Sequence, residues 1–371
     1  MENIITETQK KIFSTAMLIN LSQMFPFESS ATASANTATV INTLLTNEDI
    51  IKYIGNWSTV WGPYVIESGI IKEITQPLNS MYIACSNDLN PGVNTYLVGI
   101  AGTDFLSMEA WFTEDFNVGK TVPLPSTPIA PNHAPRIAKI AEGTCIALNN
   151  LLSMGVTESS NDGALAYLKN NVKPGDIVYV CGHSLGGTLT PVFSTYVYAQ
   201  LPDNTIYSMP IASSATGNDY FKDYYDVIFS GEKNIRIWND MDVAPHCFTE
   251  SGLAELSSLY LPTIKTTPLE DKVIKKFMKD TILDRYDQYG SYHMFTHSIY
   301  TPSEITPPPS GTATTWLEQA KCQHVAPYGE VLSWHEYLCS VTKIANSLNL
   351  GSPLAQTFFT AGCGPQCGIS S

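Results

Sequence analysis

The stretch VYVCGHSLGGTL, residues 178–189, constrains the fold more than any other part of the chain. An apolar run leads directly into the pattern Gly-x-Ser-x-Gly, centred on Ser184. In this pattern the serine stands on a tight turn between a strand and a helix, and its hydroxyl is exposed. Such a hydroxyl attacks a carbonyl only when a base takes its proton, a second group orients that base and donors hold the oxyanion. A catalytic Ser184 therefore requires a histidine, a carboxylate and oxyanion donors elsewhere in the chain.

Strand and helix patterns alternate from about residue 82 to residue 242. Apolar runs predict strands at residues 95–100, 176–181, 204–210 and 234–239, and helical spacing of apolar residues predicts helices at 136–155 and 162–172. The run before Ser184 is apolar throughout, which is typical of a central parallel strand buried on both faces. The sequence therefore predicts the α/β class, with a mostly parallel central sheet and helices on its faces.

The chain has 371 residues, of which 44% are hydrophobic, and this is enough for a large core. We expect residues 1–80 to form an N-terminal helical segment or extension packed on the core. We expect residues 81–345 to form the main α/β domain and residues 346–371 a C-terminal tail. Residues from about 251 to 310 combine a charged helical stretch with a proline-rich loop, and we interpret them as an insertion that could cap a site.

Charge and hydropathy argue against several function classes. The formal net charge of −14 disfavours nucleic acid and unassisted binding to anionic membranes, because both need clustered Lys and Arg. No run of about 18 apolar residues is present, so we predict no transmembrane segment. The chain start lacks a basic region before its apolar stretch, so we expect no signal peptide. A cytoplasmic location, or secretion by a route without a signal peptide, follows as an expectation.

Eight cysteines are scattered along the chain, and only Cys363 and Cys367 lie close together. A zinc site needs more ligands nearby than CGPQC offers, so we expect a local disulfide or two free thiols there. Cys181, on the strand before Ser184, is typical of a free buried thiol. We predict no metal ion and no cofactor.

Two carboxylates follow a later strand of the predicted sheet. The strand pattern IRIWN is followed by Asp240 and Asp242. An acid just past the end of a parallel strand lies at the same sheet edge as Ser184, where both can reach one histidine. Acids are also common in solvated turns, so position alone leaves this alternative open.

The base is harder to assign, because the chain has seven histidines. His183 lies inside the Ser184 motif and His246 directly after the acid loop, so either could be a local hydrogen-bonding group. Four others follow in the chain order Ser…Asp…His that such serine motifs use: His293, His297, His324 and His335. A lone histidine is more often structural than catalytic, so order alone selects none of the four.

Oxyanion donors can be proposed from the same logic. One is the backbone N–H of Leu185, the residue after the nucleophile. The other comes from a loop after an earlier strand, and GIAGTDF places Thr103 after a glycine at the end of TYLVG. Thr103 could offer its backbone N–H and steady the loop with its hydroxyl. An ordinary turn is the alternative for this short sequence.

Taken together, these stretches resemble the class 3 lipases, a group of α/β-hydrolases, over about residues 82–332. The resemblance lies in LVGIAGTDFLSMEAWFTEDF, VYVCGHSLGGTLT, IYSMPIASSATGNDYF, WNDMDVAPHCF and WLEQAKCQHVAPYGEVL, which occur in the family's order. It implies an α/β-hydrolase fold in which Asp242, and not Asp240, is the triad acid and His324 is the base. Ala101 stands where the family usually has arginine. The SWHEYL stretch keeps His335 as an alternative base.

The resemblance implies a serine carboxylic-ester hydrolase of the triacylglycerol lipase type, acting on lipid esters through Ser184, His324 and Asp242. Phospholipase A1 or short-chain esterase activity on the same triad is an alternative, as is acyl transfer or thioester or amide cleavage. A non-catalytic lipid-binding relative that keeps the fold is a hypothesis from another functional class. The expected partners are a lipid or other acyl-ester substrate and a lipid–water interface. The aromatic residues after Thr103 either line an acyl trough or fill the core: Phe105, Trp111, Phe112 and Phe116.

Overall fold

The structure is a computed structural model that describes residues 5–26, 28–67, 77–102, 120–125, 138–157, 159–286, 298–300, 315–331 and 335–351. Its centre is a seven-stranded sheet in the order β1-β2-β3-β6-β7-β8-β9. The first three strands pair antiparallel, and from β3 onward the pairs are parallel. The strands are β1 (Ser58–Glu67), β2 (Pro77–Ser86), β3 (Thr95–Ile100), β6 (Ile177–His183), β7 (Thr205–Ile211), β8 (Arg236–Ile237) and β9 (Ser298–Tyr300).

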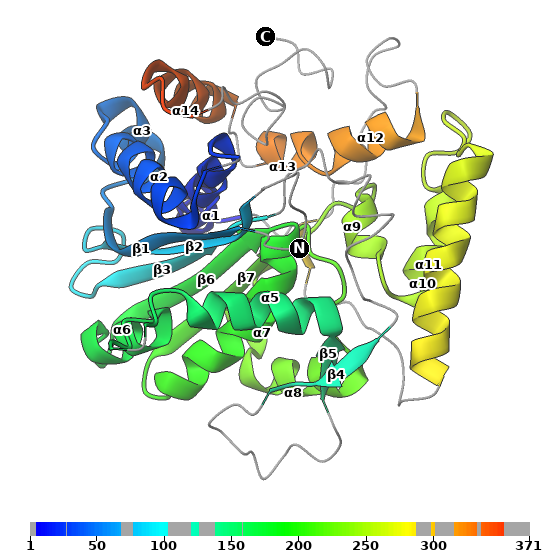
Figure 1. Ribbon diagram of the computed structural model, residues 1–371, viewed down its shortest axis with the longest axis horizontal. Coiled ribbons are helices and arrows are strands. Elements are labelled where there is room, and N and C mark those ends of the chain that lie inside the picture. The colour runs from blue at the N-terminus through cyan, green and yellow to red at the C-terminus, as the bar shows by residue number, and fades with distance from the viewer. Residues whose placement is uncertain are drawn as a thin grey trace.

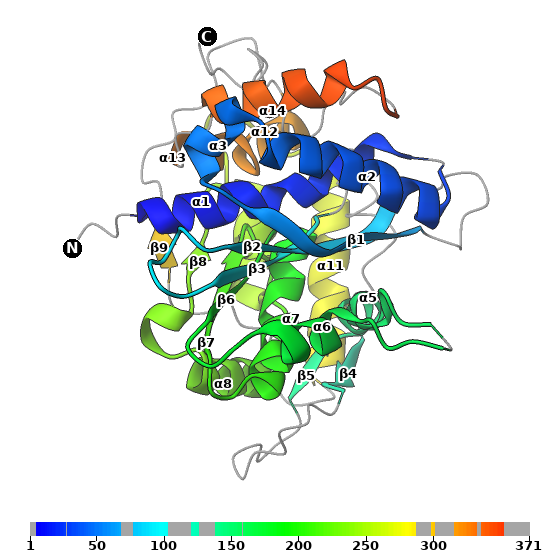
Figure 2. The ribbon, with the colours of Figure 1, turned by 90° about the vertical axis from the view of Figure 1, so that its left-hand side faces the viewer.

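Helices cover both faces of this sheet, and Figure 2 shows it edge-on between two helical layers. The first layer contains α1 (Glu7–Ala16), the 3₁₀ helix η1 (Met17–Met24), α2 (Ser30–Leu45), α3 (Glu48–Ile54) and α14 (His335–Ser347). The second contains α5 (Glu142–Ser153), α6 (Ala164–Asn171), α7 (Leu185–Gln200) and α8 (Asp219–Ile228). The predicted class, a mostly parallel sheet with helices on both faces, is confirmed.

The packing on both faces of strand β6 explains why its sequence is apolar throughout. Val178 and Val180 belong to the hydrophobic cluster beneath α5–α8, whereas Tyr179 and Cys181 belong to the cluster beneath the N-terminal helices. Side chains alternate between the two faces of a strand, so a strand covered on both sides needs apolar residues at every position. Cys181 is a free thiol with no exposed surface.

The N-terminal helices pack on the sheet through apolar and polar contacts. Thr6 begins α1 with a capping box, in which Gln9 is the reciprocal partner. The buried hydroxyl of Tyr82, on β2, donates to the backbone oxygen of Thr15. The hydroxyl of Tyr337, on α14, donates to the backbone oxygen of Ser14 at 2.6 Å. The first bond joins this layer to the sheet and the second joins two of its helices, in addition to apolar burial.

The predicted helix over residues 136–155 is wrong at its start. Residues Lys139–Ala141 form strand β5, which pairs with β4 (Thr121–Pro123), and the helix begins only at Glu142. The backbone N–H of Lys139 donates to the side chain of Asn218 at 3.0 Å, and its carbonyl accepts from the Asn218 N–H at 2.9 Å. Pairing with distant chain segments thus overrides the local helical spacing of Ile140.

A third group of helices lies beside the carboxyl ends of the parallel strands, with α10 and α11 to one side of the sheet in Figure 1. It comprises α9 (Val243–His246), α10 (Glu250–Glu255), η4 (Leu256–Ser258), α11 (Pro268–Tyr286), α12 (Trp316–Gln323) and α13 (Ala326–Val331), and a short turn η3 (Gly231–Lys233) precedes β8. Trp316 is buried in this group, where its indole N–H donates to the Leu256 carbonyl at 3.2 Å. The segment interpreted as an insertion contributes α11 here and also supplies β9 to the central sheet.

No helix among the described residues is both long and apolar enough to span a membrane. Five cysteines of the described part are free thiols: Cys85, Cys145, Cys181, Cys247 and Cys322. Cys339, on α14, is disulfide-bonded. The close pair Cys363 and Cys367 lies outside the described residues.

Candidate active site

Ser184 occupies a strained turn between β6 and α7. Its backbone has φ 60° and ψ −123°, a conformation that residues other than glycine seldom adopt. The Ser184 N–H donates to the carbonyl of Ile211 at 3.0 Å, and its own carbonyl accepts from the Thr188 N–H at 2.9 Å. These bonds hold the strained residue in place, and the side chain of Ser184 is partly exposed. This is the geometry that the Gly-x-Ser-x-Gly pattern predicts.

The glycines around Ser184 are required by close backbone contacts. A Cβ at Gly182 would lie 2.5 Å from the carbonyl carbon of Gly186, and one at Gly186 would lie 2.2 Å from the carbonyl oxygen of Ile100. A Cβ at Gly187 would lie 2.3 Å from the carbonyl oxygen of Ile211. Only glycine fits at these positions, because the start of α7 is wedged between the ends of β3 and β7.

Asp242 and His324 form a buried pair at the same edge of the sheet. The Nδ1 atom of His324 lies 2.8 Å and 2.9 Å from the two carboxylate oxygens of Asp242. Asp242 is fully buried and His324 is 2% exposed. Asp242 precedes α9, and its Oδ1 atom accepts from the Ala244 N–H at 3.0 Å. A carboxylate that binds Nδ1 leaves Nε2 of the imidazole as the nitrogen available for acid–base chemistry.

A tyrosine that the sequence interpretation did not assign completes the surroundings of the acid. The hydroxyl of Tyr328 donates to Oδ2 of Asp242 at 2.7 Å and accepts from the Asn239 N–H at 3.0 Å. Burial raises the pKa of Tyr328 well above its usual value, so it stays protonated and remains a donor. The side-chain amide of Asn239 also donates to the backbone carbonyl of Gln323 at 2.9 Å. The segment after β8 is therefore hydrogen-bonded to both α12 and α13 beside the Asp242–His324 pair.

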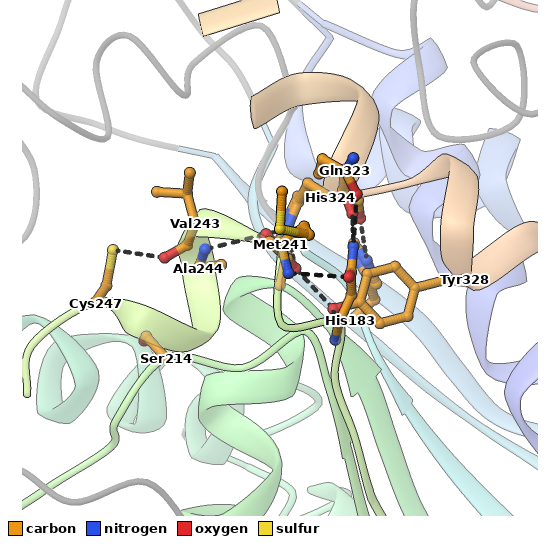
Figure 3. Close-up of polar contacts among 12 residues, drawn as sticks. His183, Ser214, Met241, Val243, Ala244, Cys247, Gln323, His324 and Tyr328 are labelled. Carbon is orange, nitrogen blue, oxygen red and sulfur yellow. Dashed lines mark hydrogen bonds and ion pairs between the residues drawn. The ribbon is translucent and has the colours of Figure 1, made fainter. Parts of the chain in front are cut away.

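His183, the residue before Ser184, lies beside His324 and Tyr328 (Figure 3). The Nε2 atom of His183 lies 2.9 Å from the backbone oxygen of His324, and the two ring centroids are 4.7 Å apart. The ring of His183 also stacks on Phe13 of α1 and meets Tyr328 edge-on. Burial holds the pKa of His183 well below its usual value, so the ring is neutral. A neutral His183 with Nε2–H donates to the His324 carbonyl, which fits a local structural role.

The oxyanion donors are only partly described. Leu185 is the first residue of α7, and the first N–H groups of a helix have no partner within the helix. Gly102 lies against the serine turn, because a Cβ on it would be 2.8 Å from the His183 carbonyl oxygen and 3.3 Å from Ser184 Cβ. Thr103, the second predicted donor, lies outside the described residues, as do the aromatic residues after it.

The other candidates for the triad acid and base are Asp240 and the remaining histidines. Asp240 does not contact His324, and its backbone carbonyl instead accepts from His246 Nε2 at 2.8 Å. The imidazole of His246 also pairs with Glu255 at 3.2 Å. His335 begins α14, which packs on α2 and α3, and its side chain is not described. His293 and His297 lie outside the described residues.

The sequence interpretation assigned no role to Tyr328, which binds Asp242, or to Asn239 and Gln323, which bind each other beside it. A signal was present, because the stretch QHVAPY places a tyrosine four residues after His324. However, the partner of that tyrosine is 86 residues away along the chain. No group of three or more His, Cys, Asp and Glu that could hold a metal ion occurs within the described ranges.

Comparisons with known proteins identify a matching family model and solved structures of similar fold. The family model described as Lipase (class 3) matches residues 98–252. The crystal structure of M37 lipase has a TM-score of 0.68 at 22% identity, covering 89% of this chain and 94% of that one. Two fungal enzymes are more distant: Lip2 lipase from Yarrowia lipolytica (TM-score 0.41, 15% identity, 66% and 74% covered) and the lipase from Rhizopus microsporus var. chinensis (0.40, 18%, 66% and 70%). No curated protein sequence matches significantly. The likeness to M37 lipase confirms the α/β-hydrolase fold.

Proposed function

We propose that this chain, whose residues 98–252 match the class 3 lipase family model, hydrolyses lipid esters with Ser184 as nucleophile, His324 as base and Asp242 as the residue that orients the base. The match to the family model supports an ester-hydrolysing enzyme, and the triad and the substrate are the proposed part. One observation carries the assignment of the triad. The buried Asp242–His324 pair lies at the sheet edge where β6 ends, and the His324 backbone is hydrogen-bonded to the residue before Ser184.

The mechanism follows from these contacts. Nε2 of His324 takes the proton of the Ser184 hydroxyl as its oxygen attacks the ester carbonyl carbon. Asp242 holds Nδ1–H and stabilises the imidazolium that forms. The Leu185 N–H, with the proposed donor Thr103, holds the tetrahedral oxyanion. The imidazolium then gives its proton to the leaving alcohol. Water, activated by the same histidine, hydrolyses the acyl-enzyme and releases the carboxylic acid.

The lipid nature of the substrate rests on the family. Triacylglycerol is the leading proposal, with phospholipid sn-1 esters and short acyl esters as alternatives on the same triad. Acyl transfer and thioester or amide cleavage on the same triad are further alternatives. The acyl-chain profile of hydrolysis therefore decides between lipase and esterase.

The test measures hydrolysis of p-nitrophenyl esters of short to long acyl chains by the wild type, by variants of the triad and by matched control variants. Ser184→Ala and His324→Ala should lower kcat by roughly 10⁴- to 10⁶-fold, because triad members act as a unit. Asp242→Asn should lower kcat by about 10⁴-fold through loss of the correct imidazole orientation. Circular dichroism should confirm that each variant is folded.

The matched controls are Asp240→Asn and His335→Ala, which replace the competing acid and the competing base. Both should retain most of the wild-type kcat. Loss of activity in His335→Ala with an active His324→Ala would transfer the base to α14 and contradict the triad. A wild-type enzyme that cleaves no ester in the series would contradict the proposed function itself.

A further inference from the structure

Helix α11 carries a row of lysines on its solvent side. Its members recur at spacings of three, four and seven residues, which place them on one face of an α-helix: Lys272, Lys275, Lys276 and Lys279. All four residues are exposed. The whole chain has 20 lysines and arginines in 371 residues, so four lysines within residues 272–279 are a marked local concentration of positive charge. We call this group the lysine face of α11.

The opposite side of α11 is the one that packs on the protein. Ile274 is 2% exposed, and Phe277 and Met278 pack in the same hydrophobic cluster. The apolar side of α11 is therefore already taken up inside the molecule, and the helix lies at the outer edge of the view in Figure 1. The core thus fixes the orientation of the helix and keeps the lysine face turned outward.

The two acids within residues 268–279 are engaged at the start of the helix. Oε2 of Glu270 accepts from the Thr267 N–H at 2.6 Å, and Oδ1 of Asp271 accepts from the Thr266 hydroxyl at 2.7 Å. Within the described part of the chain, no lysine of the face forms an ion pair. Like charges at these spacings destabilise a helix, so their grouping does not serve the fold. An anionic partner outside the chain explains it.

Helix α11 rests on the two segments that carry the proposed catalytic pair. The cluster that buries Ile274 also contains Ala244 of α9 and Ala320 of α12. Ala244 is two residues after Asp242, and Ala320 is four residues before His324. A partner bound to the lysine face is therefore held next to the elements that position the acid and the base.

An exposed leucine indicates which kind of anionic partner fits. Leu269 is 71% exposed and precedes Lys272 by three residues and Lys276 by seven, so it lies in the same row of the helix. A lipid surface accepts both groups, because lysines bind anionic headgroups while an apolar side chain enters the boundary of the acyl region. An acidic protein or a nucleic acid needs the lysines alone. The combination favours a lipid surface.

We propose that the lysine face of α11 docks the protein on an anionic lipid surface, with the four lysines at the level of the headgroups and Leu269 beside them. This inference rests on the proposed ester hydrolysis, because it names the surface from which the lipid substrate is taken. The formal net charge of −14 opposes such binding by the molecule as a whole. A single cluster of lysines therefore also sets the orientation in which the protein binds.

The test measures binding of the full chain to lipid vesicles by sedimentation, in a Ser184→Ala background so that hydrolysis does not alter the lipid. The vesicles are phosphatidylcholine with about one third phosphatidylglycerol, and pure phosphatidylcholine serves for comparison. Replacing all four lysines of the face by glutamine should lower the partition coefficient into the anionic vesicles at least about 100-fold, because each lysine adds roughly fivefold. Raising the salt from about 0.05 M to about 0.5 M should abolish binding of the unsubstituted helix.

The matched control replaces four exposed lysines on other elements by glutamine: Lys52, Lys169, Lys173 and Lys343. It changes the net charge by the same amount and leaves α11 intact, so the partition coefficient should change less than about threefold. Leu269→Ser should weaken binding roughly tenfold, because it removes the apolar contact. Glutamine forms helices about as well as lysine, so thermal melts should show every variant folded. With Ser184 restored, the α11 variant should hydrolyse a soluble short-chain p-nitrophenyl ester at the wild-type kcat.

The outcomes separate the docking surface from the proposed function. Loss of vesicle binding in the α11 variant but not in the control supports the inference. Equal loss in both variants, no binding to anionic vesicles at low salt, or binding to polyglutamate but not to vesicles would overturn it. If the wild type hydrolyses esters and binds no vesicles, the inference is wrong and the proposed hydrolysis stands. If it binds anionic vesicles through α11 and cleaves no ester, the proposed function is wrong and the docking surface is supported.

Discussion

At the scale of single residues, the environment of Asp242 decides how well the triad can work. Its carboxylate has three partners: the imidazole of His324, the N–H of Ala244 and the hydroxyl of Tyr328. A fully buried charge is costly unless it is paired and hydrogen-bonded, and these partners supply that compensation. Tyr328 matters most among the unassigned residues, because its bond limits the rotation of the carboxylate that orients the base.

Tyr328→Phe should therefore impair catalysis as well as stability. We expect kcat to fall roughly tenfold, because the carboxylate loses an orienting bond, and stability to fall by about 1–3 kcal/mol, because the Asn239 N–H loses its acceptor. The control is Tyr337→Phe, which removes another buried hydroxyl, one that binds Ser14 and does not touch the triad. It should lower the melting temperature and leave kcat unchanged. Equal kcat in both variants would assign Tyr328 a structural role only.

The Gly-x-Ser-x-Gly spacing predicted the turn at Ser184, and the resemblance of the later motifs to a known family predicted the pair of Asp242 and His324. Those residues lie in short motifs, whose local spacing carries the chemistry. Tyr328 was not assigned, because it acts through a bond to a residue 86 positions away. Nothing in a single sequence specifies which distant backbone group a buried polar side chain will meet.

At the scale of elements, the turn from β6 into α7 sets the position of the nucleophile. The start of α7 is packed so closely between β3 and β7 that glycine is needed at several positions. Strand patterns predicted this arrangement well, since residues 95–100 and 176–181 correspond to β3 and the body of β6. The helix predicted at 136–155 failed at its start because β5 pairs with β4 and with the Asn218 segment, which no local pattern reveals.

Gly186→Ala tests how tightly this turn is packed. The added Cβ would lie 2.2 Å from the Ile100 carbonyl oxygen, a backbone atom that cannot move without shifting β3. We expect unfolding free energy to fall by roughly 1–3 kcal/mol or more, as overpacking does, and activity to fall with it. Gly329→Ala is the control, because its Cβ would meet its nearest neighbour, Leu338 Cδ1, at 3.8 Å. Chemical denaturation measures both, and a wild-type stability of Gly186→Ala would contradict the packing argument.

At the scale of the whole molecule, the catalytic turn depends on chain segments that the family match does not include. The matched residues 98–252 contain half of β3 and all of β6, β7 and β8, but not β1, β2 or β9. One face of those central strands is covered by α1, η1 and α14, which all lie outside the match. The sequence indicated an N-terminal segment packed on the core, but not that it reaches the serine turn through Phe13, which stacks on His183, and through Asn20 and Gln23, which bind Gly102.

A fragment of residues 98–252 should consequently fail to fold by itself, although it contains Ser184 and Asp242. Removing the N-terminal helices and α14 exposes apolar side chains such as Tyr179, Cys181 and Met209 on one face of the sheet. Burial contributes roughly 25 cal/mol per Å² of apolar surface, and a domain is stable by only about 5–15 kcal/mol, so losing this face removes the whole margin. We expect the fragment to show no cooperative thermal transition and no near-ultraviolet circular dichroism, whereas the full chain shows both. A cooperative melt of the fragment would mean that the second helical layer alone stabilises the sheet, and that the N-terminal segment contributes to the site without being needed for the fold.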